Sequence, residues 1–166
     1  MAKLRHVSLH TADPEKTAEF YKRVFDMVEV GRTDSKFAEG IFLSDGTINL
    51  SVVRFKTKEA ADRGDGLGSA FGLHHFGFWV ENEDETRRKL REAGAEYLFT
   101  VDRPDYFEEK YKGPDAVMVD ISGRGSVGAE PIAKVCSFGL TRHFRRTPRR
   151  GCAWRSKATS VEREAP

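Results

Sequence analysis

The chain repeats one segment of its own sequence, and this repeat constrains the fold more than any other feature. The segment HVSLHTAD at residues 6–13 returns 69 residues later as HFGFWVEN at residues 75–82. Each copy begins with a histidine, alternates apolar with other residues, and ends on Asp or Asn, which commonly cap helices. A helix-like stretch follows each copy, with its inward positions at matching offsets. Self-similarity at a fixed period predicts two copies of one structural module.

The first copy reads as a strand, a helix and further strands. Alternation over residues 3–11 predicts a strand. Asp13 is a suitable helix cap, and Pro14 stands at the first helical position, so we expect a helix as far as Asp26. Two further runs, 37–42 and 47–55, flank an Asp-Gly turn and read as strands. We therefore expect a first module over residues 3–55.

The second copy repeats this order over residues 72–123. Asn82 is expected to cap a helix that ends at Gly94. The expected strands of this module start at His75 and then cover 97–101, 107–112 and 116–122, the last two joined by a Gly-Pro-Asp turn. The segment 56–70, rich in Lys, Asp and Gly, joins the modules. Its alternating glycines fit a flexible loop or active-site flap better than a phosphate-binding loop.

The charge distribution separates a body from a tail. Residues 131–166 carry a net charge of +7, whereas residues 1–130 carry −5, and the whole chain carries +2. A mildly acidic body argues against a nucleic-acid-binding surface. The basic tail has no sustained periodicity, so we expect it to be disordered or loosely attached. The alternative is an arm that binds nucleic acid or an anionic membrane. Only Phe144 and Trp154 lie near its arginines as aromatic residues that could stack on bases.

The remaining composition argues against a membrane protein and against a disulfide scaffold. No run of residues approaches the 18 apolar residues that a membrane span needs. Cys136 and Cys152 both lie in the tail, so neither a disulfide framework nor a cysteine metal site is expected. We therefore expect a cytoplasmic protein.

Strand parity indicates where a site would form. Successive side chains of a strand point to opposite faces, and the apolar faces should pack under the helices. The other faces then carry His6 and His75 in the first strand of each copy, and Asn49 and Asp120 in the last. The spacings agree, with 43 residues from His6 to Asn49 and 45 from His75 to Asp120. If the copies pair around a pseudo-two-fold axis, these four positions converge.

Such convergence predicts a metal site. Two imidazoles and a carboxylate, from His6, His75 and Asp120, suit Fe²⁺, Mn²⁺, Ni²⁺ or Zn²⁺ and leave positions for a substrate. A cation would also compensate the charge of Asp120 on a mostly apolar strand. Asn49 is either a fourth ligand or a group that hydrogen-bonds to a ligand.

Other polar or aromatic residues are candidates for the same site. His10 shares the face of His6 and is either an acid/base or substrate-binding group, or a partly exposed strand histidine. Trp79 is either the apolar wall of a pocket or a core residue. Tyr106 and Glu108 either supply a proton-transfer group or are ordinary solvated loop residues.

These motifs resemble the vicinal oxygen chelate superfamily, which includes glyoxalase I, methylmalonyl-CoA epimerase, extradiol dioxygenases and bleomycin-resistance proteins. The resemblance covers residues 3–123 and leaves out the tail. It rests on LRHVSL at 4–9 with Asp13 and Phe20-Tyr21, on HHFGFWV at 74–80, and on GPDAVMVD at 113–120.

The resemblance implies an α+β fold in which two paired βαβββ modules form an open, barrel-like cleft around one metal ion. Members with two modules commonly form homodimers, so a homodimer that binds a small-molecule substrate is expected. Glyoxalase-like members usually place Glu or Gln where this chain has Asn49, and Glu where it has Asp120.

Three functions remain open. The set of two histidines and one carboxylate resembles the facial triad of ring-cleaving dioxygenases, so an enzyme with Fe²⁺ or Mn²⁺ is the leading expectation. A glyoxalase I- or epimerase-like lyase or isomerase with Ni²⁺, Zn²⁺ or Co²⁺ is the first alternative. The second is a non-catalytic, bleomycin-resistance-like protein that sequesters its ligand.

Overall fold

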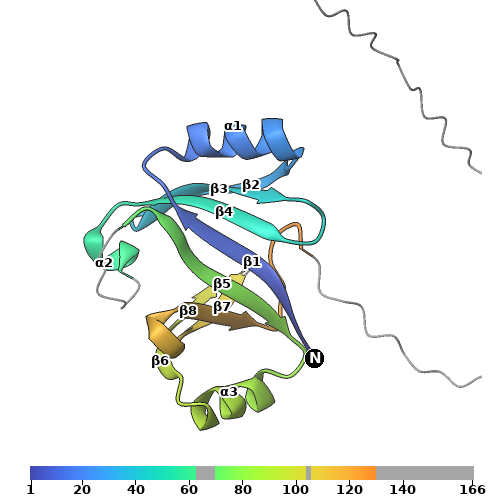
Figure 1. Ribbon diagram of the computed structural model, residues 1–166, viewed down its shortest axis with the longest axis vertical. Helices are drawn as coiled ribbons and strands as arrows, with labels where there is room; N and C mark the ends of the chain where they lie inside the picture. Colours follow the sequence, from blue (N-terminus) through green and yellow to red (C-terminus); the bar gives the residue numbers. More distant parts are fainter. Residues whose placement is uncertain (63–69, 104–105, 130–166) are drawn as a thin grey trace, which may run out of the picture. The chain divides into compact units, whose positions relative to one another are not determined.

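The computed structural model describes residues 1–62, 70–103 and 106–129 of the chain (Figure 1). The first module contains β1 (Ala2–His10), α1 (Pro14–Phe25), β2 (Val28–Asp34), β3 (Ala38–Ser44) and β4 (Asn49–Phe55). The second contains β5 (Gly72–Val80), α3 (Glu83–Glu92), β6 (Glu96–Arg103), β7 (Tyr106–Lys112), the 3₁₀ turn η1 (Pro114–Ala116) and β8 (Met118–Ser122). The expectation of an α+β fold with two βαβββ modules is confirmed.

The eight strands form one curled sheet in the order β2-β3-β4-β1-β5-β8-β7-β6 (Figure 1). β1 pairs with β4, and β5 with β8, in parallel. At the centre, β1 and β5 pair antiparallel, so the two modules meet edge to edge within one chain. This symmetry brings equivalent positions of the repeat together.

The register of the central strands aligns the positions that the sequence singles out. His6 lies opposite Asn49 on β4 and opposite Gly77 on β5. Gly77 in turn lies opposite Asp120 on β8. His75 is two residues from Gly77 and therefore shares its face of the sheet. Four neighbouring strands thus direct these side chains to one side.

The opposite face of the first module packs under α1, as strand parity predicts. Asp13 accepts a hydrogen bond from the backbone N–H of Lys16 at 3.0 Å and so caps the helix. Ala18 of the helix is fully buried against the sheet. The core around it contains Ile41, Leu43, Leu50 and Val52, with Val7 and Leu9 of β1 packed against them.

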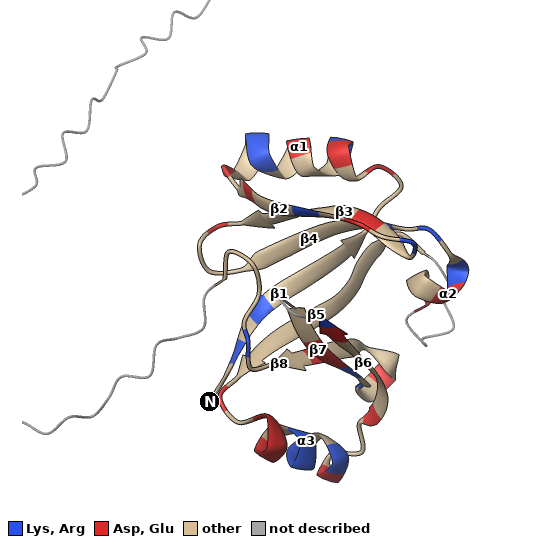
Figure 2. Cartoon of the chain, turned by 180° about the vertical axis from the view of Figure 1, so that it is seen from behind, with Lys and Arg blue, Asp and Glu red and all other residues tan. Residues whose placement is uncertain are grey.

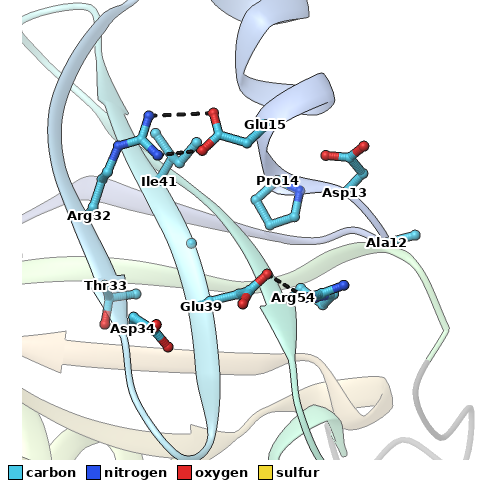
Figure 3. Close-up of a pocket in the computed structure, with 11 residues that line it drawn as sticks. Ala12, Asp13, Pro14, Glu15, Arg32, Thr33, Asp34, Glu39, Ile41 and Arg54 are labelled. Carbon is cyan, nitrogen blue, oxygen red and sulfur yellow. Dashed lines mark hydrogen bonds and ion pairs between the residues drawn. The ribbon is translucent and has the colours of Figure 1, made fainter.

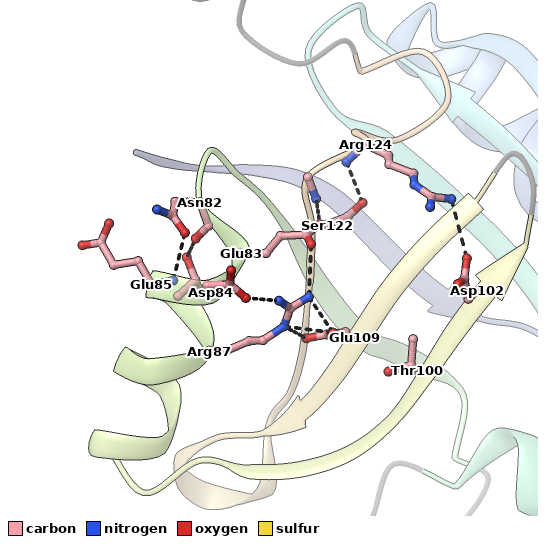
Figure 4. Close-up of polar contacts among 12 residues, drawn as sticks. Asn82, Glu83, Asp84, Glu85, Arg87, Thr100, Asp102, Glu109, Ser122 and Arg124 are labelled. Atoms are coloured by element: carbon pink, nitrogen blue, oxygen red, sulfur yellow. Dashed lines mark hydrogen bonds and ion pairs between the residues drawn. The ribbon is translucent and has the colours of Figure 1, made fainter.

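The second helix is attached in a different way, because no residue of α3 is buried. Charged residues cover it (Figure 2). Arg87 donates from Nε to both carboxylate oxygens of Glu109 on β7, at 2.8 and 3.0 Å (Figure 4). Glu83 accepts the backbone N–H of Gly123 at 2.7 Å. Ion pairs and hydrogen bonds, together with the half-buried Leu90, therefore hold α3 over a small core of Val80, Tyr111 and Ile121.

Tyr111 gives this attachment a pH dependence. Its hydroxyl donates to Glu109 at 3.0 Å, and burial, together with that hydrogen bond, raises the pKa of Tyr111 to about 12. The unfolded chain releases this proton near pH 10. The stability that Tyr111 contributes is therefore complete below pH 10 and is lost as the pH rises towards 12.

A Tyr111→Phe variant should therefore be less stable by about 1 kcal/mol at pH 8, because one hydrogen bond is lost. This difference should shrink between pH 10 and 12. Urea unfolding at pH 8 and at pH 11.5 measures both values. Tyr97→Phe is the control, because Tyr97 is half exposed and its hydroxyl hydrogen-bonds only to Thr100 within the described residues. A difference that is independent of pH would contradict the assignment.

Some details differ from the sequence-based expectations. The strand β2 was not predicted individually, and the connecting segment contains a short helix, α2 (Lys58–Ala61), capped by Thr57. The alternating glycines of this segment lie outside the described residues, as does the basic tail over 131–166. No helix among the described residues is long and apolar enough to cross a membrane.

Candidate metal centre

Four buried side chains from four strands converge at the centre of the sheet. They are His6 on β1, His75 on β5, Glu108 on β7 and Asp120 on β8. One ligand atom of each lies within 4.8 Å of those of the others. Two imidazole nitrogens and two carboxylate oxygens are a donor set that fits a divalent metal ion. We call these four residues the ligand group.

A hydrogen bond at Nδ1 of His6 determines that its other ring nitrogen, Nε2, faces the ligand group. The amide nitrogen of Asn49 donates to the Val127 carbonyl at 2.7 Å, so its oxygen faces His6 Nδ1, also at 2.7 Å. His6 Nδ1 must then carry the proton, which leaves a lone pair on Nε2. Asn49 therefore orients His6, in the way that outer hydrogen bonds orient metal-binding histidines.

His75 also has close partners at both of its ring nitrogens. Its Nδ1 lies 2.7 Å from His74 Nδ1, and its Nε2 lies 3.2 Å from His6 Nε2 and 3.1 Å from Asp120 Oδ2. Burial, with the nearby charge of Lys110, holds the pKa of His75 well below its usual value. The ring is therefore neutral, and its contact with Asp120 is not an ion pair. His6 Nε2, His75 Nε2 and Asp120 Oδ2 thus lie close enough together to bind one cation.

A lysine supplies positive charge at this point. The Nζ of Lys110 on β7 lies 2.8 Å from Glu108 Oε2, 3.0 Å from Asp120 Oδ2 and 3.2 Å from His75 Nε2. Burial alone lowers the pKa of Lys110, but the two carboxylates outweigh it and raise the pKa above its usual value. Lys110 is therefore an ammonium ion among the residues of the ligand group.

The structure brings together the three ligands expected from the sequence, His6, His75 and Asp120. It adds Glu108, which strand β7 turns inward although a solvated loop position was the default expectation, and Lys110, which was not expected at all. Parity places residues 106, 108, 110 and 112 on one face of β7, but only the pairing of Lys110 with Asp120 identifies that face as the one turned to the group.

The other candidates lie beside the ligand group or away from it. The phenol of Tyr106 is next to Glu108, and burial and that carboxylate raise its pKa well above the usual value. The Trp79 indole is buried and donates to the Gly123 carbonyl at 3.1 Å. His10 is not in the group. It packs between Phe55 and Phe71, with Nδ1 3.3 Å from the Ala70 carbonyl.

Two surface cavities are separate from the ligand group. One, of about 600 Å³, lies beside the start of α1, where Arg32 pairs with Glu15 and Arg54 with Glu39 (Figure 3). The other, of about 340 Å³, is lined by His10 and residues of β4 and α2. No residue of the ligand group lines either cavity. All four residues of the group are buried.

The sequence matches one family model over most of its described length. The model of the Glyoxalase/Bleomycin resistance protein/Dioxygenase superfamily matches residues 3–121. The chain therefore belongs to this superfamily, as its motifs led us to expect. A comparison with curated proteins found no match.

Solved structures show the same fold at low sequence identity. A hypothetical protein from Bacillus halodurans is 17% identical to this chain, with a TM-score of 0.60. The match covers 72% of this chain and 92% of the Bacillus protein. Methylmalonyl-CoA epimerase from Streptomyces coelicolor, in complex with 2-nitronate-propionyl-CoA, is 14% identical with a TM-score of 0.59 and coverages of 72% and 94%. The Mycobacterium tuberculosis epimerase is 18% identical, with a TM-score of 0.58 and coverages of 71% and 85%.

Both modules contribute to the ligand group within a single chain, since His6 comes from the first and the other three residues from the second. A partner subunit is therefore not needed to complete it. The homodimer expected from the sequence remains a prediction.

Proposed function

We propose that this protein is a divalent-metal-dependent enzyme of the isomerase type, which moves a proton on a carbon next to a carbonyl group. Its substrate would be a small acyl compound that presents two neighbouring oxygens. One observation carries the proposal: the ligand atoms of His6, His75, Glu108 and Asp120 lie within 4.8 Å of one another in a buried site.

The fourth ligand is the reason to prefer isomerisation to ring cleavage. The expectation of a dioxygenase rested on a set of three ligands, and Glu108 adds a second carboxylate that favours a site with four ligands. The similar folds of methylmalonyl-CoA epimerases agree with an isomerase, although their identity to this chain is below 20%. For the same reason the metal need not be Fe²⁺, and Mn²⁺, Co²⁺, Ni²⁺ and Zn²⁺ all suit nitrogen and oxygen donors.

The roles of the residues follow from their contacts. A bound metal ion would supply Lewis-acid stabilisation of an enolate-like anion. His6 and His75 would hold it through Nε2, oriented by Asn49 and His74. We assign proton transfer to Glu108, because the phenol of Tyr106 lies beside its carboxylate and can hydrogen-bond it in either protonation state. The carboxylate of Asp120 packs closely against Gly77, so it has little freedom to move during proton transfer.

The proposal is tested by metal content and then by proton exchange. Wild type and a His75→Ala variant would be purified anaerobically without chelator and measured by elemental analysis. We expect near-stoichiometric divalent metal in wild type and less than about one tenth of it in the variant, because a ligand is lost. His10→Ala is the matched control for metal content, since His10 is a buried histidine of the same sheet outside the group.

Exchange of the α-proton of methylmalonyl-CoA in D₂O, followed by NMR, would then test the reaction type. Metal-dependent exchange that disappears in His75→Ala supports an isomerase. Consumption of O₂ with catechols and no proton exchange would favour the dioxygenase instead. An absence of metal from both proteins, even after incubation with each ion, would overturn the catalytic proposal and favour a ligand-sequestering protein.

A further inference from the structure

The ammonium of Lys110 has the contacts of a bound cation rather than those of an ordinary surface lysine. An ammonium group has three N–H donors. Here three acceptors surround Nζ, namely Glu108 Oε2 at 2.8 Å, Asp120 Oδ2 at 3.0 Å and His75 Nε2 at 3.2 Å. Each acceptor belongs to the ligand group. The side chain of Lys110 is only 8% exposed.

The strand pairing explains why Lys110 reaches this position. Lys110 lies directly opposite Asp120 in the β7–β8 register, and Glu108 is two residues away on the same face of β7. Most lysines at such a position would extend their stem to solvent, since burial of an unpaired charge is costly. Two carboxylates and an imidazole make burial favourable here.

A divalent metal ion would need the same three atoms. Glu108 and Asp120 together carry two negative charges, which one divalent ion neutralises, whereas an ammonium neutralises only one of them. An ammonium and a metal ion on the same acceptor atoms would repel each other at close range. The two cations therefore exclude one another.

We propose that Lys110 is a built-in cation that fills the ligand group when metal is absent, and that a metal ion enters only by displacing its ammonium. Lys110 thereby sets the metal affinity of the site and keeps the metal-free protein folded. The four-carbon stem allows the ammonium to withdraw while β7 keeps its register. This inference rests on the proposed metal-binding function.

Calorimetric titration of chelator-stripped protein with Mn²⁺ and with Zn²⁺ tests the competition. Lys110→Met removes the charge and keeps the stem, and we expect it to bind metal at least about tenfold more tightly than wild type. The matched control is Lys112→Met on the same face of β7, since Lys112 pairs with Glu96 outside the group. Its metal affinity should equal that of wild type.

Thermal unfolding provides a second readout that does not depend on activity. In chelator, Lys110→Met should melt well below wild type, because two buried carboxylates lose their only ammonium partner among the described residues. Added metal should raise its melting temperature more than it raises that of wild type.

A second pair of variants keeps the test decisive if Lys110→Met does not fold without metal. Glu108→Gln and the double variant Glu108→Gln/Lys110→Met leave fewer uncompensated charges, and the double variant should bind metal more tightly than Glu108→Gln alone. Equal affinities within each pair would overturn the role of Lys110 and leave the metal function intact. Binding only in proteins without Lys110 would support the resident cation and overturn metal dependence of the natural chain. Binding in none would overturn both.

Discussion

An Asp120→Asn variant is expected to lose metal affinity by at least about 100-fold and to unfold more easily in chelator by about 3 kcal/mol, the usual scale for breaking a buried charge pair. Asp120 is 2% exposed, and its Oδ2 accepts from Lys110 at 3.0 Å. The substitution keeps the shape of the side chain and removes its charge. It also leaves the ammonium of Lys110 with Glu108 as its one remaining carboxylate in the ligand group.

Calorimetric titration with Mn²⁺ measures the affinity, and urea unfolding in chelator measures the stability. Asp102→Asn is the matched control, because Asp102 is an exposed carboxylate paired with Arg124 at 3.6 Å. A surface substitution of this kind should change stability by less than about 0.5 kcal/mol. If Asp120→Asn behaved like the control in both measurements, the carboxylate would not belong to a cation site.

Sequence alone predicts the part of this site that depends on strand parity and on the repeat. Val7 and Leu9 alternate with His6, and the same pattern recurs around His75, so which face each histidine takes is determined. The two-fold relation of the modules then places His6 and Asp120 on either side of Gly77, as the strand register confirms. Periodicity is a reliable signal when only one face of a strand is apolar.

Parity gives no such answer for β7. Its sequence, YFEEKYK, puts charged residues on both faces, so neither face is marked as the buried one. Glu109 is buried on the side facing α3, where it pairs with Arg87, while Glu108 and Lys110 face the ligand group. Only the partners distinguish them, and those partners come from α3 and β8. Buried lysines are also rare enough that a sequence argument places them in solvent by default.

His10 illustrates a different limit. It shares the face of His6, so parity makes it a candidate for the same site. Four residues of strand, however, separate the two by roughly 13 Å at about 3.3 Å per residue. His10 therefore packs among Phe55 and Phe71 at the end of β1, where it lines a separate cavity. Strand parity predicts which face of the sheet a side chain takes, but it does not predict how close two side chains on that face lie.

Gly77→Ala is the second substitution for which we expect a large effect, because a single methyl group would enter the ligand group. An ideal Cβ at Gly77 would lie 2.2 Å from Asp120 Oδ1 and 2.7 Å from His6 Cβ. The backbone angle at Gly77 is one that alanine also adopts, so the cost arises from space alone. We expect a loss of about 3 kcal/mol in stability, at the upper end for an overpacked core, and at least about tenfold weaker metal binding.

The matched control is Gly31→Ala, at another strand glycine whose backbone angle is equally permissive. A Cβ there would meet the flexible ring of Phe42 at 3.2 Å, so stability should change by less than about 1 kcal/mol. Thermal unfolding should separate the two variants by roughly 10 °C, since about 3 kcal/mol corresponds to that shift in a domain of this size. A Gly77→Ala protein with wild-type stability and metal affinity would mean that His6 and Asp120 do not approach each other across β5. Because glycine at this position lets β1, β5 and β8 present their ligands at one point, Gly77 is as necessary to the proposed site as the ligands themselves.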